Sequence, residues 1–296
     1  MYAFCVDRGA DCNCLSLMEI GSEADHRTGR LNMRMIKLYF LHIKYAVKSG
    51  MQFKTNFIMA WSSNILSYLI IYLQAFILTR NYPVIGGWSY PEIVLLMAMQ
   101  FFSYSIANTL FYGILHNMDQ YINNGDLDRM MVRPVHPIFS IVWKQFNWAG
   151  ISQIFLSLAF LIYSLSVNEI RWSWERGALF FLCLVGAVLL QCGVFIGFGA
   201  TAFWLKRSAS LSQMLYFNFA VFSNYPINIY NRTIRVILST VLPWAYVNFY
   251  PAAMLLEKEI AWKQLYLLTP VIGAAAFLLG ILLMRRGLSR YESVGN

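Results

Sequence analysis

Hydrophobic residues fall into seven long runs along the chain, separated by short polar stretches. The runs lie near 57–79, 92–115, 138–167, 177–204, 209–230, 236–256 and 264–284. Because an α-helix rises 1.5 Å per residue, about 20 apolar residues span a hydrocarbon core roughly 30 Å thick. The pattern therefore predicts an all-α polytopic membrane protein.

The stretch before the first run has a different pattern. Residues 1–32 are polar, with several acids, and contain no apolar run long enough for a signal sequence, so we expect a disordered extension. Over 33–54, basic residues fall on one side of a helix and apolar residues on the other. This predicts an interfacial amphipathic helix, with a long cytoplasmic start to the first span as the alternative. Its basic positions are Arg34, Lys37, Lys44 and Lys48.

Composition supports the membrane assignment. The 296 residues are 58% hydrophobic and only 12% charged, whereas soluble globular proteins carry about 25% charged residues. This excludes a soluble domain. The net charge of +9 comes from basic residues spread over short loops, and the lack of a single basic patch argues against nucleic-acid binding.

The distribution of basic residues predicts the number of crossings. With a cytoplasmic amino end, seven crossings would put the arginine-rich tail outside, although basic segments tend to stay in the cytoplasm. If 236–256 instead enters and returns on the outer side, thirteen basic residues lie inside and seven outside. Pro243 and Pro251, with Asn248 between them, also interrupt that run. We therefore predict six transmembrane helices in 55–296, a re-entrant outer hairpin between spans five and six, and two cytoplasmic termini.

Side chains for catalysis or ion transport are sparse. Glu92, at the mouth of span two, is the one acid close to the bilayer, which argues against a proton-coupled or sodium-coupled carrier, although backbone carbonyls can also bind sodium. The sequence has no HExxH, GxSxG, GxxxxGK[ST] or helix-opening GxGxxG motif. We expect no catalytic residue, no metal and no cofactor on this chain, so any ATP is used by another chain.

Small residues recur with helical spacing in span four. Gly193 and Gly197 form a GxxxG pattern. Such residues let two helix backbones approach closely, so this pattern predicts packing against a neighbouring span.

The loop at 116–137 mixes apolar, acidic and basic positions. The pattern predicts a short amphipathic helix ended by Asn124-Gly125, then an acid-rich turn and a second short segment. A solvated polar hairpin is the alternative, because loops of this length are often simple connectors. The positions concerned are Met118, Tyr121 and Ile122 on the helix, followed by Asn124, Gly125, Asp126, Leu127, Asp128, Arg129, Arg133 and Pro134.

Several short sequence motifs occur along the chain in a characteristic order. They are Asn124-Gly125-Asp126-Leu127-Asp128, Arg133-Pro134-Val135, Phe222-Ser-Asn-Tyr-Pro226, Leu242-Pro243-Trp-Ala-Tyr246 and Asn248-Phe-Tyr-Pro251-Ala252. With the interfacial helix and the six-span plan, the chain from about Met33 onward resembles permease subunits of bacterial ATP-binding-cassette (ABC) exporters of the type-2 class. The likeness is strongest to an uncharacterised bacterial branch of that class.

The resemblance implies a function for each part. The chain would be the membrane subunit of an exporter in the bacterial cytoplasmic membrane, with ATP and Mg on a separate nucleotide-binding (ATPase) subunit. The loop from Asn124 to Pro134 would couple to that subunit beside the interfacial helix, and 236–256 would lie over the translocation path. A second permease chain, identical or different, would complete the path. An ATP-independent channel or secondary carrier is the alternative.

The resemblance also implies that spans one, two and five line the path. The candidate lining residues are aromatic and uncharged, which favours an amphipathic or lipid-like substrate over an inorganic ion. They are Tyr68, Tyr72, Phe101, Tyr104, Tyr216 and Phe219.

Overall fold

A computed structural model describes residues 48, 54–132, 137–205, 208–258 and 263–292, and it contains helices but no strands over those residues. The predicted extension at 1–32 lies outside the described residues. So do Arg34, Lys37 and Lys44 of the predicted interfacial helix and Arg133 and Pro134 of the loop, while Lys48 is helical and exposed. The interfacial helix therefore stays a prediction.

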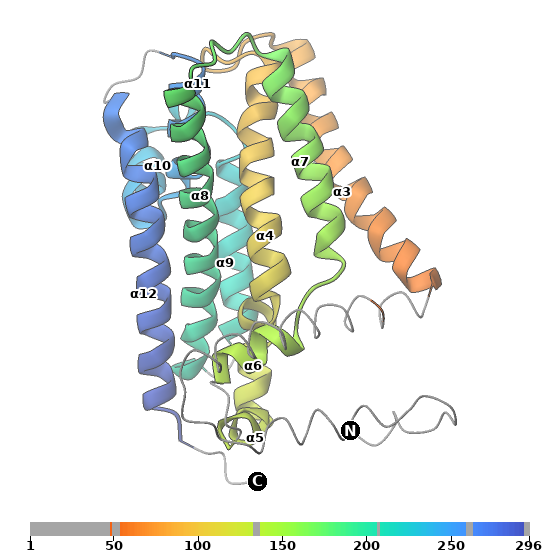
Figure 1. The fold of residues 1–296 in the computed structure, drawn as a ribbon, viewed down its shortest axis with the longest axis vertical. Helices are drawn as coiled ribbons and strands as arrows, with labels where there is room; N and C mark the ends of the chain where they lie inside the picture. Colours follow the sequence, from red (N-terminus) through yellow and green to blue (C-terminus); the bar gives the residue numbers. More distant parts are fainter. Residues whose placement is uncertain (1–47, 49–53, 133–136, 206–207, 259–262, 293–296) are drawn as a thin grey trace.

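Five long helices form a bundle (Figure 1). They are α3 (Lys54–Asn81), α4 (Tyr90–Asn123), α7 (Gly150–Val167), α8 (Trp174–Ala200) and α12 (Thr269–Ser289). Each is long and apolar enough to cross a membrane, α8 together with the turn η1 (Thr201–Phe203) and α12 together with most of η5 (Lys263–Leu268). These five correspond to predicted spans one, two, three, four and six.

The remaining predicted span, 209–230, is shorter than expected. Its helix, α9 (Ser208–Phe222), has 15 residues, or about 22 Å at 1.5 Å per residue, which is less than a hydrocarbon core. The helix ends before Pro226, whose ring cannot continue a helix, and the single turn η2 (Ile227–Ile229) follows. A sixth crossing therefore remains a prediction.

The predicted third span, 138–167, is divided in two. A short helix α6 (Pro137–Lys144) is separated by 145–149 from α7, so the run predicted as one span was too long. The backbone N–H of Asn147, in this break, donates to the carbonyl oxygen of Thr109 at 3.1 Å. This carbonyl belongs to the interior of α4, and α4 is kinked close by at Phe111, where φ is −115° and ψ is 17°. A segment that inserts against a helix ladder is a known cause of such kinks.

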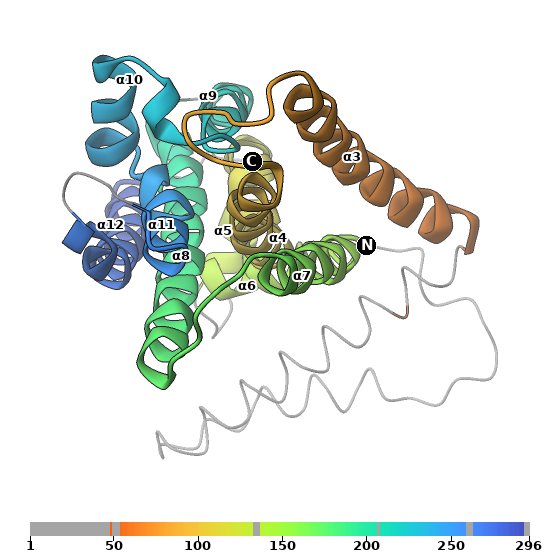
Figure 2. The ribbon, with the colours of Figure 1, turned by 90° about the horizontal axis from the view of Figure 1, so that it is seen from above.

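Helix α4 occupies the middle of the bundle when it is seen from above, with α8 and α12 on one side and α7 and α3 on the other (Figure 2). Helices α8 and α12 meet along a seam of glycines. A Cβ atom added at Gly280 would lie 2.5 Å from the carbonyl oxygen of Gly193, and one at Gly273 would lie 2.9 Å from the Cα of Gly186. The close packing predicted for Gly193 is confirmed, whereas a Cβ atom added at Gly197 would meet α12 only at 4.0 Å, an ordinary contact distance.

Residues 232–256 fold into short helical pieces in the upper half of Figure 1. These are α10 (Arg232–Val236), the π-helical turn η3 (Ile237–Val241), η4 (Trp244–Tyr246) and α11 (Phe249–Leu255). Helical conformation is interrupted at Leu242-Pro243. The whole segment from Trp244 to Ala253 is buried. Asn248 Nδ2 donates to the carbonyl oxygens of Leu96 at 3.2 Å and Ser223 at 2.5 Å. Its amide thus ties this segment to α4 and to the residue that follows α9, while re-entry into a membrane remains a prediction.

Candidate functional site

A pocket of about 240 Å³ lies between α3, α4, α7 and α9. At its opening, Phe217 and Val221 of α9 are 43% and 58% exposed, whereas Tyr68 of α3 and Gln100 of α4 are buried. The exposed part of the lining is therefore mostly apolar, whereas the buried part contains polar atoms. It is lined by Ser67, Tyr68, Ile71, Gln100, Phe101, Tyr104, Gln153, Tyr216, Phe217, Ala220, Val221 and Asn224.

Stacked aromatic rings form much of the pocket wall. The ring of Tyr104 stacks on Tyr216 with centroids 5.9 Å apart, and Tyr68 meets Phe101 at 4.6 Å. Such ring pairs contribute about 0.5–1.5 kcal/mol beyond the burial of their area. The wall is therefore a packed surface joining α3, α4 and α9.

Four of the six predicted path residues line this pocket, namely Tyr68, Phe101, Tyr104 and Tyr216. The other two lie outside it. Tyr72 stacks on Phe160 of α7 at 3.8 Å, and Phe219 stacks on Trp244 at 6.3 Å. The structure thus brings predicted residues of spans one, two and five together, and their role in a path stays a prediction.

The sequence analysis missed the pocket's amide side chains. Gln153 Oε1 accepts from Asn108 Nδ2 at 3.1 Å, and Gln153 Nε2 donates to Asn64 Oδ1 at 3.1 Å. These bonds link α3, α4 and α7. Gln100, also missed, could have been identified from the sequence. It lies four residues before Tyr104 in an apolar run, so the two side chains share a helix face.

The lower end of the bundle carries the predicted coupling residues from Asn124 to Arg129. Residues 116–123, predicted as a separate short helix, instead continue α4, which ends at the expected Asn124-Gly125. Gly125 has φ +68°, a left-handed conformation that glycine adopts without steric cost. The acid-rich segment that follows is helix α5 (Asp126–Met131), and Arg129 pairs with Asp126 across one turn at 3.0 Å.

Helix α5 is anchored on one side and exposed on the other. Leu127 and Met130 are buried in a cluster with Met118 of α4, Ile196 of α8 and Met284 of α12. The outer side ends in apolar groups, since Met131 is 47% exposed and Val132 is 88% exposed. Burial and the carboxylate of Asp128 raise the pKa of Tyr291, just beyond α12, to about 12. Residues of α4, α8 and α12 therefore meet on the buried side of α5, whose other side is exposed.

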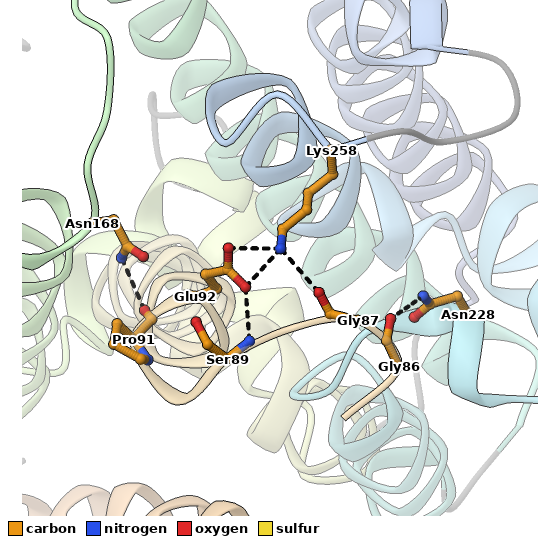
Figure 3. Close-up of polar contacts among 8 residues, drawn as sticks. All are labelled: Gly86, Gly87, Ser89, Pro91, Glu92, Asn168, Asn228 and Lys258. Atoms are coloured by element: carbon orange, nitrogen blue, oxygen red, sulfur yellow. Dashed lines mark hydrogen bonds and ion pairs between the residues drawn. The ribbon is translucent and has the colours of Figure 1, made fainter. Parts of the chain in front are cut away.

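Polar contacts of Glu92 tie the upper end together (Figure 3). The carboxylate of Glu92 pairs with Lys258 Nζ at 2.7 Å and accepts from the backbone N–H of Ser89 at 2.7 Å. Lys258 Nζ also donates to the carbonyl oxygen of Gly87 at 2.9 Å. Glu92 thus caps α4 and holds the end of the 232–258 segment against the loop before α4, with its charge compensated by a lysine.

No group of three His, Cys, Asp or Glu side chains within the described residues could hold a metal ion. No curated protein and no solved structure matches the chain. The family model described as ABC-2 family transporter protein matches residues 56–295. Since this match covers well over half of the sequence, the chain belongs to the ABC-2 family of transporter proteins.

Proposed function

We propose that this chain is the permease subunit of an ABC exporter that moves its substrate outward using ATP hydrolysed on a separate subunit. The membrane would be the bacterial cytoplasmic membrane, with α5 on the cytoplasmic side. Helix α3 begins and α12 ends toward the lower end of the bundle (Figure 1). This supports an even number of crossings, in which α9 and the turns after it supply the sixth.

The observation that carries the proposal is the connection between α5 and the pocket. Helix α4 has 34 residues and contains Gln100 and Tyr104 above its kink and Met118 below it. Met118 packs in the same cluster as Leu127 of α5. Closure of an ATPase pair against α5 would therefore move the lower part of α4 directly, which is the differential contact that a two-state transporter requires.

A second permease chain would complete the path. Only four residues of the 28 in α3 are buried, namely Tyr68, Tyr72, Ala75 and Thr79. The exposed side chains of α3 include leucine and isoleucine along most of the helix. Lipid or another protein must therefore cover this helix, and an identical or related permease would place the pocket at the interface between the two subunits.

The test is a charge placed on the exposed end of α5. Val132→Asp should reduce both the ATPase that remains bound to the tagged chain in mild detergent and the ATP hydrolysis of the reconstituted complex, because α5 would be the docking surface. The double change Asp126→Lys with Asp128→Lys should abolish coupled hydrolysis while the protein stays in the membrane.

The matched control is Val84→Asp, which places the same charge on a valine that is 61% exposed in the loop between α3 and α4. This variant should retain the ATPase and its activity. Equal retention by the Val132 and Val84 variants would contradict the docking assignment. Full transport in vesicles that lack any ATPase would instead support an ATP-independent carrier.

A further inference from the structure

Two residues that line the pocket each carry a buried polar atom with no hydrogen-bond partner among the described residues. These atoms are the hydroxyl of Tyr68 and Oε1 of Gln100, on side chains that are 5% and 2% exposed. Buried polar atoms in folded proteins are paired in the great majority of cases, because an unpaired one keeps its full desolvation cost. Since both atoms belong to residues that line one pocket, a ligand that enters it could pair with both.

Two other polar side chains of the pocket are already engaged. The amide of Gln153 bonds to Asn108 and Asn64, and the hydroxyl of Tyr216 donates to Gln191 Oε1 at 2.7 Å. The buried and unpaired atoms of the lining therefore include a donor, the Tyr68 O–H, and an acceptor, Gln100 Oε1.

The described residues of the lining carry no charge. None of the twelve residues that surround the pocket is acidic or basic, and the rim at Phe217 and Val221 is apolar. An ion in this position would lose its hydration without gaining a countercharge, which is far more costly than the burial of a neutral polar group that is hydrogen-bonded. The lining thus selects for neutral molecules.

We propose that this pocket binds an uncharged amphipathic molecule whose apolar, ring-sized body lies against Tyr104 and Phe217 and whose polar end pairs with Tyr68 and Gln100. The polar end would supply one acceptor and one donor, as a neutral amide does. This inference rests on the proposed transport function, for which it names the class of substrate.

The test uses three naphthalene probes that differ only in their polar group. The full-length chain in lipid nanodiscs is titrated with 1-naphthylacetamide, with the 1-naphthylacetate anion and with 1-methylnaphthalene, and fluorescence anisotropy is corrected with empty nanodiscs. We expect saturable binding of the amide and binding at least about tenfold weaker for the other two. Gln100→Leu and Tyr68→Phe should each weaken the amide about tenfold, as loss of one buried hydrogen bond does.

The matched control is Tyr72→Phe. It removes an equally buried and unpartnered hydroxyl one turn further along α3, from a residue that does not line the pocket, and amide binding should not change. Melting temperatures show whether each variant is folded, and Tyr68→Phe serves if Gln100→Leu is not. Wild-type affinity in both pocket variants, equal binding of the anion, or no saturable binding would overturn the proposal. These measurements need no ATPase, so their failure is distinct from failure of the Val132→Asp test.

Discussion

The glycine seam between α8 and α12 leads to a sharp test of packing. Gly193→Ala adds one methyl group, whose carbon would lie 2.5 Å from both the carbonyl oxygen of Ala276 and the backbone nitrogen of Phe277. Ordinary contacts of such atoms are about 3.5–4 Å. Because both neighbours are backbone atoms, no side-chain rotation relieves the clash, and the two helices must separate by about 1 Å.

The expected loss of stability follows from the free-energy cost of forcing the two helices apart. Overpacking of this kind costs about 1–3 kcal/mol, and we expect the upper half of that range because the obstruction is backbone. Using about 2–4 °C per kcal/mol for a chain of comparable size, the melting temperature should fall by about 5–10 °C. The assay is thermal unfolding of the purified protein in detergent, followed by tryptophan fluorescence.

Gly197→Ala, one turn further along α8, is the matched control. Its added carbon would have its nearest neighbours at 4.0 Å, the Cα of Gly280 and a methyl of Leu283. Both variants gain the same helix propensity, at most about 1 kcal/mol, so their difference isolates the contact with α12. Equal melting temperatures for the two variants would refute the argument that the seam depends on backbone contact.

Two further predictions concern the ends of α4. In a double-mutant cycle, Glu92→Gln and Lys258→Gln should each lower the melting temperature, and the pair should show a coupling of about 1 kcal/mol, because the ion pair is only partly exposed; purely additive losses would show that the pair does not act as a unit. Gly125→Ala should cost about 1–2 kcal/mol at φ +68°, measured by thermal unfolding. Gly125→Asn should cost less, since asparagine tolerates this conformation, and an equal cost would point to another cause.

Much of the bundle could be predicted from the sequence because its signals are local. Four of the six predicted spans, near 57–79, 92–115, 177–204 and 264–284, form undivided helices of membrane length, and Asn124-Gly125 ends a helix through its own backbone preferences. The division of 138–167 was not predictable in this way. It depends on Asn147 meeting the carbonyl of Thr109, a contact between segments that the hydrophobic pattern of either one does not contain.

The candidate site was likewise predictable in part from the sequence. Aromatic residues of spans one, two and five were predicted to share a surface, and Tyr68, Tyr104 and Tyr216 do line one pocket. Tyr72 and Phe219 do not, because helix rotation turns them toward Phe160 and Trp244. That rotation is set by packing among α3, α7, α9 and the 232–256 segment, and aromatic content alone does not determine it.

The kink at Phe111 divides α4 into two sections that could bend relative to each other. Its lower section, from Phe111 to Asn123, is about 18 Å long at 1.5 Å per residue, so a change of only 10° in the bend would displace the lower tip by about 3 Å. That displacement is close to half a helical turn at α5, while the residues that line the pocket could stay almost still. A small angular change at one residue would therefore suffice to convert motion at an ATPase surface into a change of shape beneath the pocket.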